Sequence, residues 1–213
     1  MSGPERPPAS PPPSPARGRY GWIVGIVGIV VLAYILLNTL RTEGPGSSGP
    51  AAGAPLPVFA APLVDSSLEG DANVATRADQ GDAGHVPACA VEDPRALNVC
   101  TLVRRGPLVL AFLTAKGGKC ADELDAMQEI SGRFPDVSFA AVGIKGDRED
   151  FRVLAQKHGW RFPLAQDRDG AVANLYGIAV CPTVVLAHRG GAVAETLLGG
   201  VSAVQLAERV REL

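Results

Sequence analysis

A single cysteine follows a glycine turn at a point where a strand is expected to lead into a helix. Residues 112–124 read FLTAKGGKCADEL and place this residue, Cys120, after an apolar run and before a helical pattern. A cysteine in the first turn of a helix lies near unpaired amides and the positive end of the helix dipole, and both favour the thiolate. Lys116 and Lys119 add positive charge at the same place. The stretch therefore predicts a reactive cysteine, although a cysteine packed as a small hydrophobic residue fits the same letters.

The beginning of the chain reads as an appendage to one compact domain, residues 56–213. Residues 1–19 are polar and rich in proline, so we expect a disordered cytoplasmic tail. Residues 20–40 carry no charge, and a helix of this length spans about 32 Å, which is enough to cross a bilayer. We favour a transmembrane helix over a cleaved signal peptide, because the run is long and no small-residue cleavage site closely follows it. Residues 41–55 read as a flexible linker.

The charges around residues 20–40 predict the orientation of the chain. Positive residues collect on the cytoplasmic side of a membrane-spanning helix. The arginines before the run are Arg6, Arg17 and Arg19, and only Arg41 follows it closely. We therefore expect a single-pass protein of the cell membrane with a cytoplasmic N-terminus and an extracytoplasmic C-terminal domain.

Two further kinds of partner have little support. The formal net charge is −2 and the chain has no basic cluster, which argues against nucleic acid. The spacing Gly21-x-x-x-Gly25 is one that membrane helices use to pack against each other, so a weak homodimer is compatible with the sequence. Glycine is common in membrane helices, however, and this pair lies at one end of the run.

Four cysteines, Cys89, Cys100, Cys120 and Cys181, allow three pairings. In an oxidising compartment a local disulfide is the natural assignment for the first two, which are separated by ten residues. Closing a loop of that size stabilises a fold by about 2.5–3 kcal/mol in the chain-entropy model. Nearness in the sequence favours a structural Cys89–Cys100 disulfide together with a Cys120–Cys181 pair, and two pairs of free thiols remain an alternative.

Apolar runs and helical patterns alternate through the domain. Expected extended segments or strands are 56–63, 73–76, 108–114, 137–144, 162–165, 183–187 and 192–198. Expected helices are 121–134, 148–159 and 171–176, the last with Asp169 as its N-cap. A final helix follows Ser202 as N-cap, with Val204, Ala207 and Val210 facing inward. This order predicts an α/β domain with a mixed central sheet flanked by helices.

Several short motifs carry a resemblance to a known family. They are residues 109–112 before the glycine turn, 120–124 after it, 167–170 with 175–177, 180–183, and 189–191. In this order they resemble the thioredoxin-like fold, and within it the membrane-tethered TlpA and redoxin (AhpC-TSA-like) branch. The resemblance covers about residues 56–213. It implies a thiol–disulfide oxidoreductase that acts on exported thiol or disulfide proteins, or on small thiols.

The chain departs from that family at its redox turn. The usual motif is Trp-Cys-x-x-Cys, whereas residues 116–120 read KGGKC. Gly117 stands where the attacking cysteine is expected, so a dithiol cycle within the turn is excluded. The peroxiredoxin pattern Pro-x-x-x-Thr-x-x-Cys is not met either, because Thr114 lies six residues before Cys120 instead of three.

The resemblance implies a replacement for the missing cysteine. In the thioredoxin-like fold the residue before a cis-proline touches the redox turn, and here that residue is Cys181, followed by Pro182. We expect Cys120 and Cys181 to form a non-contiguous redox pair, with Cys120 as the low-pKa thiol or with the two roles reversed. Exchange would pass through a mixed disulfide, and Pro182 would hold the loop beside a substrate. The supporting residues are Thr114, Lys116 and Lys119.

Other hypotheses remain open from the sequence. A permanent Cys120–Cys181 bond would leave a catalytically silent module that binds a partner protein, and a peroxidase is a third hypothesis. The histidines are His85, His158 and His188, and none has ligand spacing to Cys120, so no metal is expected. The sequence has no phosphate loop, dinucleotide fingerprint or serine-nucleophile motif, so no cofactor is expected.

Overall fold

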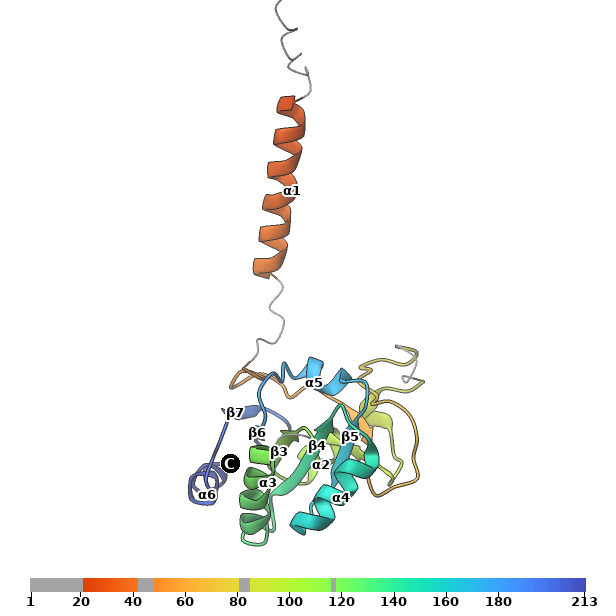
Figure 1. Ribbon diagram of the computed structural model, residues 1–213, viewed down its shortest axis with the longest axis vertical. Helices are drawn as coiled ribbons and strands as arrows, with labels where there is room; N and C mark the ends of the chain where they lie inside the picture. Colours follow the sequence, from red (N-terminus) through yellow and green to blue (C-terminus); the bar gives the residue numbers. More distant parts are fainter. Residues whose placement is uncertain (1–20, 42–47, 81–84, 116–117) are drawn as a thin grey trace, which may run out of the picture. The chain divides into compact units, whose positions relative to one another are not determined.

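The computed structural model describes residues 21–41, 48–80, 85–115 and 118–213, and the chain divides into two compact units, residues 1–43 and 44–213 (Figure 1). The first unit contains helix α1 (Gly21–Arg41), whose described side chains, those of residues 22–36, are all exposed. In the part of the chain that the structure describes, no helix has both the length and the apolar character needed to cross a membrane. The expected tail, residues 1–19, lies outside the described residues.

The second unit is built on a five-stranded sheet with the strand order β5-β4-β3-β6-β7. The strands are β3 (Leu108–Leu113), β4 (Ser138–Ile144), β5 (Leu164–Asp167), β6 (Thr183–Ala187) and β7 (Val193–Leu198). Strands β3, β4 and β5 are parallel, β6 pairs antiparallel with β3, and β7 pairs antiparallel with β6, so the predicted mixed sheet is confirmed. All six residues of β3 are buried, because helices cover both faces of the sheet.

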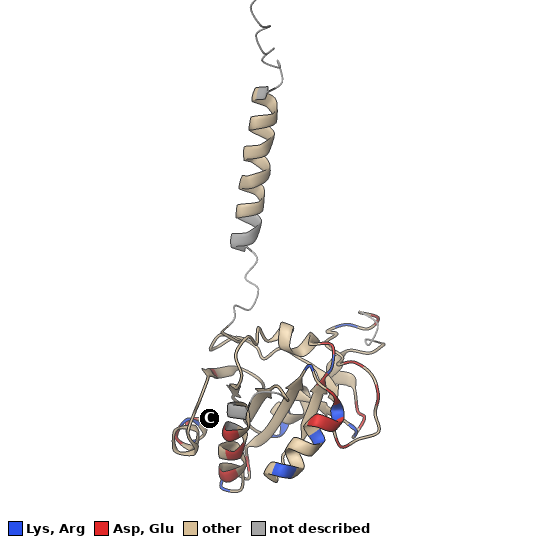
Figure 2. Cartoon of the chain, viewed as in Figure 1, with Lys and Arg blue, Asp and Glu red and all other residues tan. Residues whose placement is uncertain are grey.

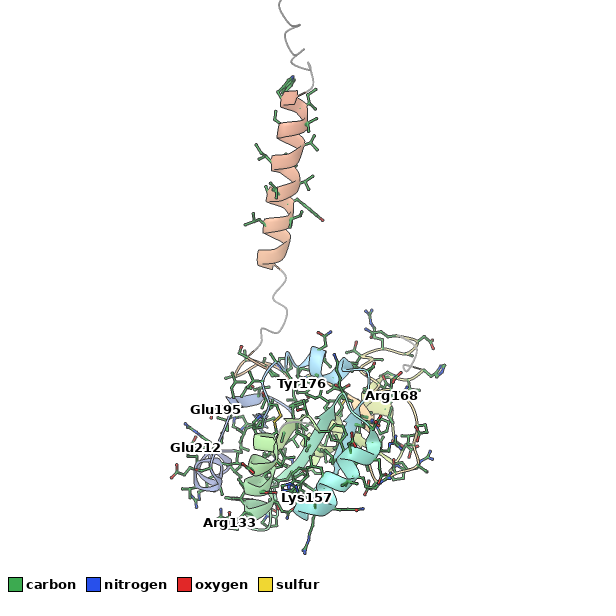
Figure 3. The ribbon with its side chains drawn as sticks, in the orientation of Figure 1. Arg133, Lys157, Arg168, Tyr176, Glu195 and Glu212 are labelled. Carbon is green, nitrogen blue, oxygen red and sulfur yellow. A yellow bond between two sulfur atoms is a disulfide. The ribbon has the colours of Figure 1, made fainter. Side chains whose placement is uncertain are left out.

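The two faces of the sheet carry different helices (Figure 1). Helices α3 (Gly118–Ser131), α4 (Arg148–His158) and α6 (Ala203–Val210) share one apolar cluster with alternate residues of β3. The other cluster joins the remaining residues of β3 to α2 (Val99–Arg105) and α5 (Ala171–Leu175). Tyr176 fills this second cluster, with its ring centre 5.0 Å from that of Phe112 (Figure 3). This layering fixes the position of the turn that follows β3.

The folded unit begins before the expected boundary at residue 56. Ser48 forms a bridge with Ile178 and Pro55 with Ala192, and the amide of Gly53 donates to the carbonyl of Val193 at 2.8 Å. The second half of the expected linker therefore packs along β7, while residues 42–47 lie outside the described residues.

Segments near the start of the domain differ from the expectations. The extended segment at 56–63 contains only a three-residue strand, β1 (Ala60–Pro62). It pairs antiparallel with β2 (Ala96–Asn98), which leads directly into α2. A short 3-10 helix, η1 (Ala88–Ala90), precedes this pair. The sequence patterns indicated neither β2 nor α2, because both are too short to show a clear periodicity.

The ends of helices α5 and α6 show whether single residues have the roles that the sequence predicted. Ser202 accepts from the amide of Gln205 in a capping box, so the expected cap of α6 is confirmed. The expected cap of α5 is wrong: Gly170 is its N-cap, and the carboxylate of Asp167 accepts from the amides of Val172 (3.0 Å) and Ala173 (2.8 Å). Asp169 accepts from the amide of Ala171 at the longer distance of 3.3 Å. Val204 is also not inward, since 69% of its surface is exposed.

Candidate thiol–disulfide site

The site lies at the end of β3, where the chain turns into α3. Cys120 is in the first turn of α3 and is only 4% exposed. Residues Phe112 and Thr183 are register partners in the antiparallel β3–β6 pair, which brings the segment before β6 to the same edge of the sheet. Cys181 lies in that segment, is partly exposed, and forms a disulfide with Cys120 across a Cα–Cα distance of 5.7 Å.

The loop that carries Cys181 is held from both sides. The Cys181–Pro182 peptide bond is cis, as the resemblance implied. The carbonyl of Pro182 accepts from the amide of Gly199 at 3.0 Å, and the hydroxyl of Thr183 donates to the carbonyl of Val180 at 2.7 Å. These bonds fix the position of Cys181 against β6 and β7.

Thr114 contacts the exposed partner of the disulfide. Its hydroxyl lies 3.9 Å from the sulfur of Cys181, in a geometry in which the oxygen donates. The carbonyl oxygen of Phe112 lies at the same distance from that sulfur. When the bond is open, the Thr114 donor favours a Cys181 thiolate, whereas the Phe112 acceptor favours a thiol.

The structure describes little of the two lysines that were expected to favour the Cys120 thiolate. Lys116 lies outside the described residues, and of Lys119 only the backbone, as part of α3, is described. Acidic side chains follow along the same helix (Figure 2), among them Asp122 and Asp125. Helix position and the Thr114 hydroxyl are therefore the described features that favour a thiolate at this site.

Comparison with known proteins shows which families and structures this domain resembles. Residues 91–196 match the model of the AhpC/TSA family. This match and the relatives below support the redoxin branch of the thioredoxin superfamily for this part of the chain, the redoxin domain. The thiol-disulfide oxidoreductase ResA of Bacillus thuringiensis (strain Al Hakam) is 26% identical over 89 residues, which cover 41% of this chain and 51% of that protein. ResA of Bacillus anthracis matches equally, so the chain spans about half the length of the curated relatives it matches.

Solved structures agree with the redoxin domain in fold. A thioredoxin-family thiol:disulfide interchange protein of Chlorobium tepidum TLS has a TM-score of 0.57 at 13% identity, covering 76% of this chain and 97% of its own. A secreted Mycobacterium tuberculosis disulfide oxidoreductase, homologous to E. coli DsbE, has a TM-score of 0.52 at 21% identity. It covers 55% of this chain and 89% of its own. At these identities the likeness concerns the thioredoxin-like fold alone.

A polar cluster that the sequence patterns did not reveal joins α3 and α4 of the redoxin domain. One carboxylate oxygen of Asp125 accepts from the indole Nε1 of Trp160 at 2.7 Å, and the other lies 2.9 Å from Nδ1 of His158. The rings of His158 and Trp160 stack with centres 5.2 Å apart. Asp125 follows Cys120 by five residues on α3, so the cluster supports the helix that carries the buried sulfur. A helical pattern alone gives no sign of such a contact between two helices.

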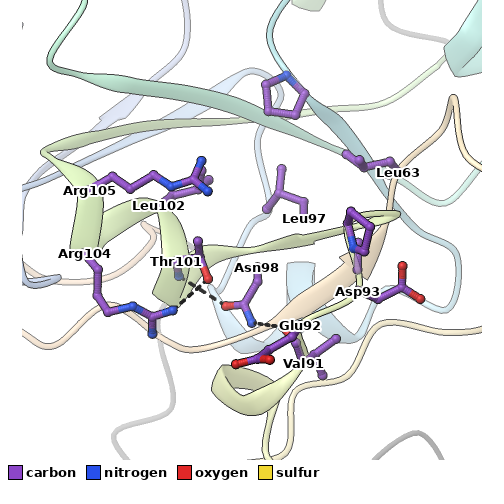
Figure 4. Close-up of a pocket in the computed structure, with 13 residues that line it drawn as sticks. Leu63, Val91, Glu92, Asp93, Leu97, Asn98, Thr101, Leu102, Arg104 and Arg105 are labelled. Carbon is purple, nitrogen blue, oxygen red and sulfur yellow. Dashed lines mark hydrogen bonds between the residues drawn. The ribbon is translucent and has the colours of Figure 1, made fainter.

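The described residues of the redoxin domain include no cluster that could serve as a metal centre. They contain no group of three or more His, Cys, Asp or Glu residues placed to hold a metal ion. A cleft of about 520 Å³ beside β2 and α2 (Figure 4) has acidic and basic side chains on its walls but no cysteine. Asp93 in this cleft already pairs with Arg95, whose hydrogen bonds lower the pKa of the Asp93 carboxyl to about 2.

The second disulfide of the redoxin domain joins Cys89 of η1 to Cys100 of α2, with a Cα–Cα distance of 5.4 Å. It lies away from the first disulfide, because α2 precedes the opposite end of β3. The pairing is the one that nearness in the sequence favoured.

Proposed function

We propose that this domain catalyses thiol–disulfide exchange, with Cys120 and Cys181 as a redox pair drawn from two separate segments. The observation that carries the proposal is the position of the Cys120–Cys181 bond, between the first turn of α3 and the cis-proline loop, with one sulfur partly exposed. The names of the relatives, which are thiol-disulfide oxidoreductases, support the same chemistry.

The difference in exposure gives the two cysteines separate roles. An incoming thiolate attacks the sulfur of Cys181, the Cys120–Cys181 bond breaks, and Cys120 leaves as a thiolate that takes up a proton. A second thiolate of the substrate then attacks the substrate sulfur of the mixed disulfide. Cys181 is released as a thiolate and the substrate becomes a disulfide. Because Cys120 is buried, this order favours the reversed assignment, in which Cys181 attacks and Cys120 resolves.

The proposed substrates are exported thiol or disulfide proteins, or small thiols. The membrane proposal rests on the sequence: residues 20–40 lack charge, and most of the flanking arginines precede them. We place the N-terminus in the cytoplasm and the domain outside it. Residues 20–40 would then keep the full chain in the membrane fraction after carbonate extraction. Complete release by carbonate would contradict the anchor.

Mixed-disulfide trapping on the full chain tests the redox pair. Reduced Cys120→Ser should accumulate a mixed disulfide between Cys181 and an oxidised disulfide protein, because the sulfur that would resolve it is missing. Cys181→Ser should trap far less, since its remaining sulfur is buried. Both variants should lose insulin reduction. Full insulin reduction by Cys181→Ser would contradict the pair.

The alternative is a catalytically silent binding module. Glycine occupies position 117, where the attacking cysteine is expected, and this favours the alternative. The two hypotheses differ in the lability of the Cys120–Cys181 bond. A bond with a reduction potential below about −300 mV behaves as structural, and a higher potential marks an exchanging pair. A peroxidase has less support, because Thr114 contacts Cys181 and does not precede Cys120 at the peroxiredoxin spacing.

A further inference from the structure

The second disulfide exposes one of its two cysteines and buries the other. Cys89 is exposed on the short helix η1, whereas Cys100 is 7% exposed in the first turn of α2. A disulfide is opened by a thiolate that reaches one of its sulfurs. Cys89 is therefore the more accessible end of the Cys89–Cys100 bond, and Cys100 is the more protected leaving group.

A buried asparagine holds the two ends of this bond together without the bond. The Nδ2 atom of Asn98 donates to the carbonyls of Ala88 (2.9 Å) and Val91 (2.8 Å), which flank Cys89. Its Oδ1 atom accepts from the amide of Cys100 at 2.9 Å. It also accepts from the amide of Thr101 at 3.4 Å (Figure 4). The side chain thus joins η1 to the start of α2 through four hydrogen bonds. If the disulfide opens, these bonds keep the two sulfurs close enough to close again.

The same disulfide forms part of the wall of a small apolar pocket. The pocket has a volume of about 320 Å³, and both Cys89 and Cys100 line it. Its lining also includes three aliphatic side chains, those of Val58, Val99 and Val103. An apolar group of a few carbon atoms fits this volume and removes aliphatic surface from water.

We propose that Cys89–Cys100 is a second exchange site, which takes a small thiol with an apolar substituent. The thiolate of the small thiol attacks the sulfur of Cys89 and forms a mixed disulfide there. The Cys89–Cys100 bond breaks, Cys100 leaves as a thiolate and takes up a proton, and the substituent occupies the apolar pocket. The reverse attack by Cys100 on Cys89 releases the small thiol and restores the disulfide. One disulfide forms for each disulfide that breaks, so the exchange needs no other oxidant or reductant.

The two disulfides act separately, because they lie at opposite ends of β6. Thr183, next to Cys181, begins this strand, whereas Gly190 and Gly191, which line the apolar pocket, follow its end at Ala187. Direct exchange between the two pairs within one molecule is therefore excluded by the sheet between them. The second site also does not depend on the function proposed for Cys120 and Cys181.

Titration of the oxidised full chain with two small thiols tests the proposal. Benzyl mercaptan and 2-mercaptoethanol are each added over a range of concentrations, and every cysteine is identified by peptide mass spectrometry after acid quenching. We expect an adduct on Cys89, with Cys100 free, at an at least fivefold lower concentration of benzyl mercaptan than of 2-mercaptoethanol. An adduct on Cys100, equal response to the two thiols, or no opening of this bond would each overturn the proposal.

Three variants separate the pocket and the asparagine from general effects. Val58→Phe fills the pocket and should abolish the preference for benzyl mercaptan, while Val204→Phe, on the exposed face of α6, should keep it.

Asn98→Asp keeps the acceptor for the start of α2 but loses both donors to Ala88 and Val91. After removal of the thiol, it should re-form the disulfide several-fold more slowly than the wild-type chain. Unchanged closure in Asn98→Asp would show that the asparagine does not position the two sulfurs. Because all four cysteines are read in one experiment, failure at Cys89 is distinguishable from failure at Cys181.

Discussion

At the scale of residues, the reactivity of the site depends on which of its two sulfurs is accessible to solvent. The sequence placed the reactive thiol at Cys120 because a helix start favours a thiolate. The structure buries that sulfur and leaves Cys181 partly exposed, with the Thr114 hydroxyl beside it. Reactivity in exchange needs access as well as thiolate character. The two requirements therefore fall on different cysteines of the pair.

Thr114 provides a test of this assignment. Thr114→Val removes the hydroxyl donor at nearly constant volume, so it should slow alkylation of reduced Cys181 by iodoacetamide at neutral pH by about two- to fivefold, the size expected for one weak hydrogen bond. Thr114→Ser keeps the donor and should stay close to wild type. Alkylation is followed by mass spectrometry of the reduced chain. Equal rates for all three proteins would remove Thr114 from the site.

The sequence predicted some single-residue roles and missed others for physical reasons. Cys120, Cys181 and Pro182 could be placed because a resemblance supplied long-range neighbours that spacing alone does not contain. Asp169 was favoured as a cap by its position, but Asp167, at the buried end of β5, reaches the amides instead. The signal that could have found Asp167 is its place as the last residue of a strand, three residues before a glycine in the left-handed region.

At the scale of elements, the contact of α3 with the end of α4 has a polar centre in Asp125. Asp125→Ala leaves the indole N–H of the buried Trp160 and the ring of His158 without this partner, which should cost about 1–3 kcal/mol of unfolding free energy. Asp122→Ala, an exposed change one turn earlier on the same helix, is the matched control. Urea unfolding followed by tryptophan fluorescence measures both. A midpoint in Asp125→Ala equal to that of the control would show that the cluster is incidental.

The start of α5 gives the domain a pH dependence. Asp167 has no exposed surface, and burial raises the pKa of its carboxyl more than the amides of Ala173 and Val172 lower it. The folded protein therefore binds this proton more tightly than the unfolded chain. The resulting stabilisation is present below the unfolded pKa, about 3.9, and is lost as pH rises through the higher folded pKa.

The variant Asp167→Asn lacks this titration. The unfolding free energy of the wild-type protein, measured relative to the variant by urea unfolding, should therefore fall as pH rises above about 4. Asp65→Asn, at an exposed position, should show no such relative fall. A difference between wild type and Asp167→Asn that stays constant from about pH 3.5 to 7 would contradict the raised pKa.

The helices and strands that could be predicted best from the sequence were those with long periodic patterns. Strands β3 and β4 and helices α3 and α4 were expected within three residues of their bounds, since each buries a continuous run or one face. Strand β2 and helix α2 were missed, because a three-residue strand and a seven-residue helix carry too few residues to show a period. Val204 was assigned inward by the same spacing rule, but α6 turns this position to solvent and packs Leu206 instead.

At the scale of the whole molecule, the domain extends into the segment that composition assigned to a linker. Gly, Ser and Pro predict flexibility when a segment has no partner. Here the edge strand β7 supplies one, through the bonds from Gly53 to Val193, from Val193 to Ala54, and from the Thr196 hydroxyl to the carbonyl of Pro50. Composition alone does not reveal a neighbour of this kind, which is why the boundary at residue 56 came too late.

Two truncations test the role of this segment. A chain that begins at residue 44 keeps the contacts along β7, whereas one that begins at residue 56 loses three hydrogen bonds, each with a net contribution of about 1 kcal/mol. The shorter chain should unfold at a lower temperature, with a loss of about 1–3 kcal/mol by urea unfolding, because the edge of β7 is left open to water. A Thr196→Val change in the longer chain removes the hydroxyl donor to the carbonyl of Pro50 and should lose part of this stability. Equal unfolding midpoints for the two truncations would show that residues 48–55 only lie beside β7, and the domain would then begin where the composition changes.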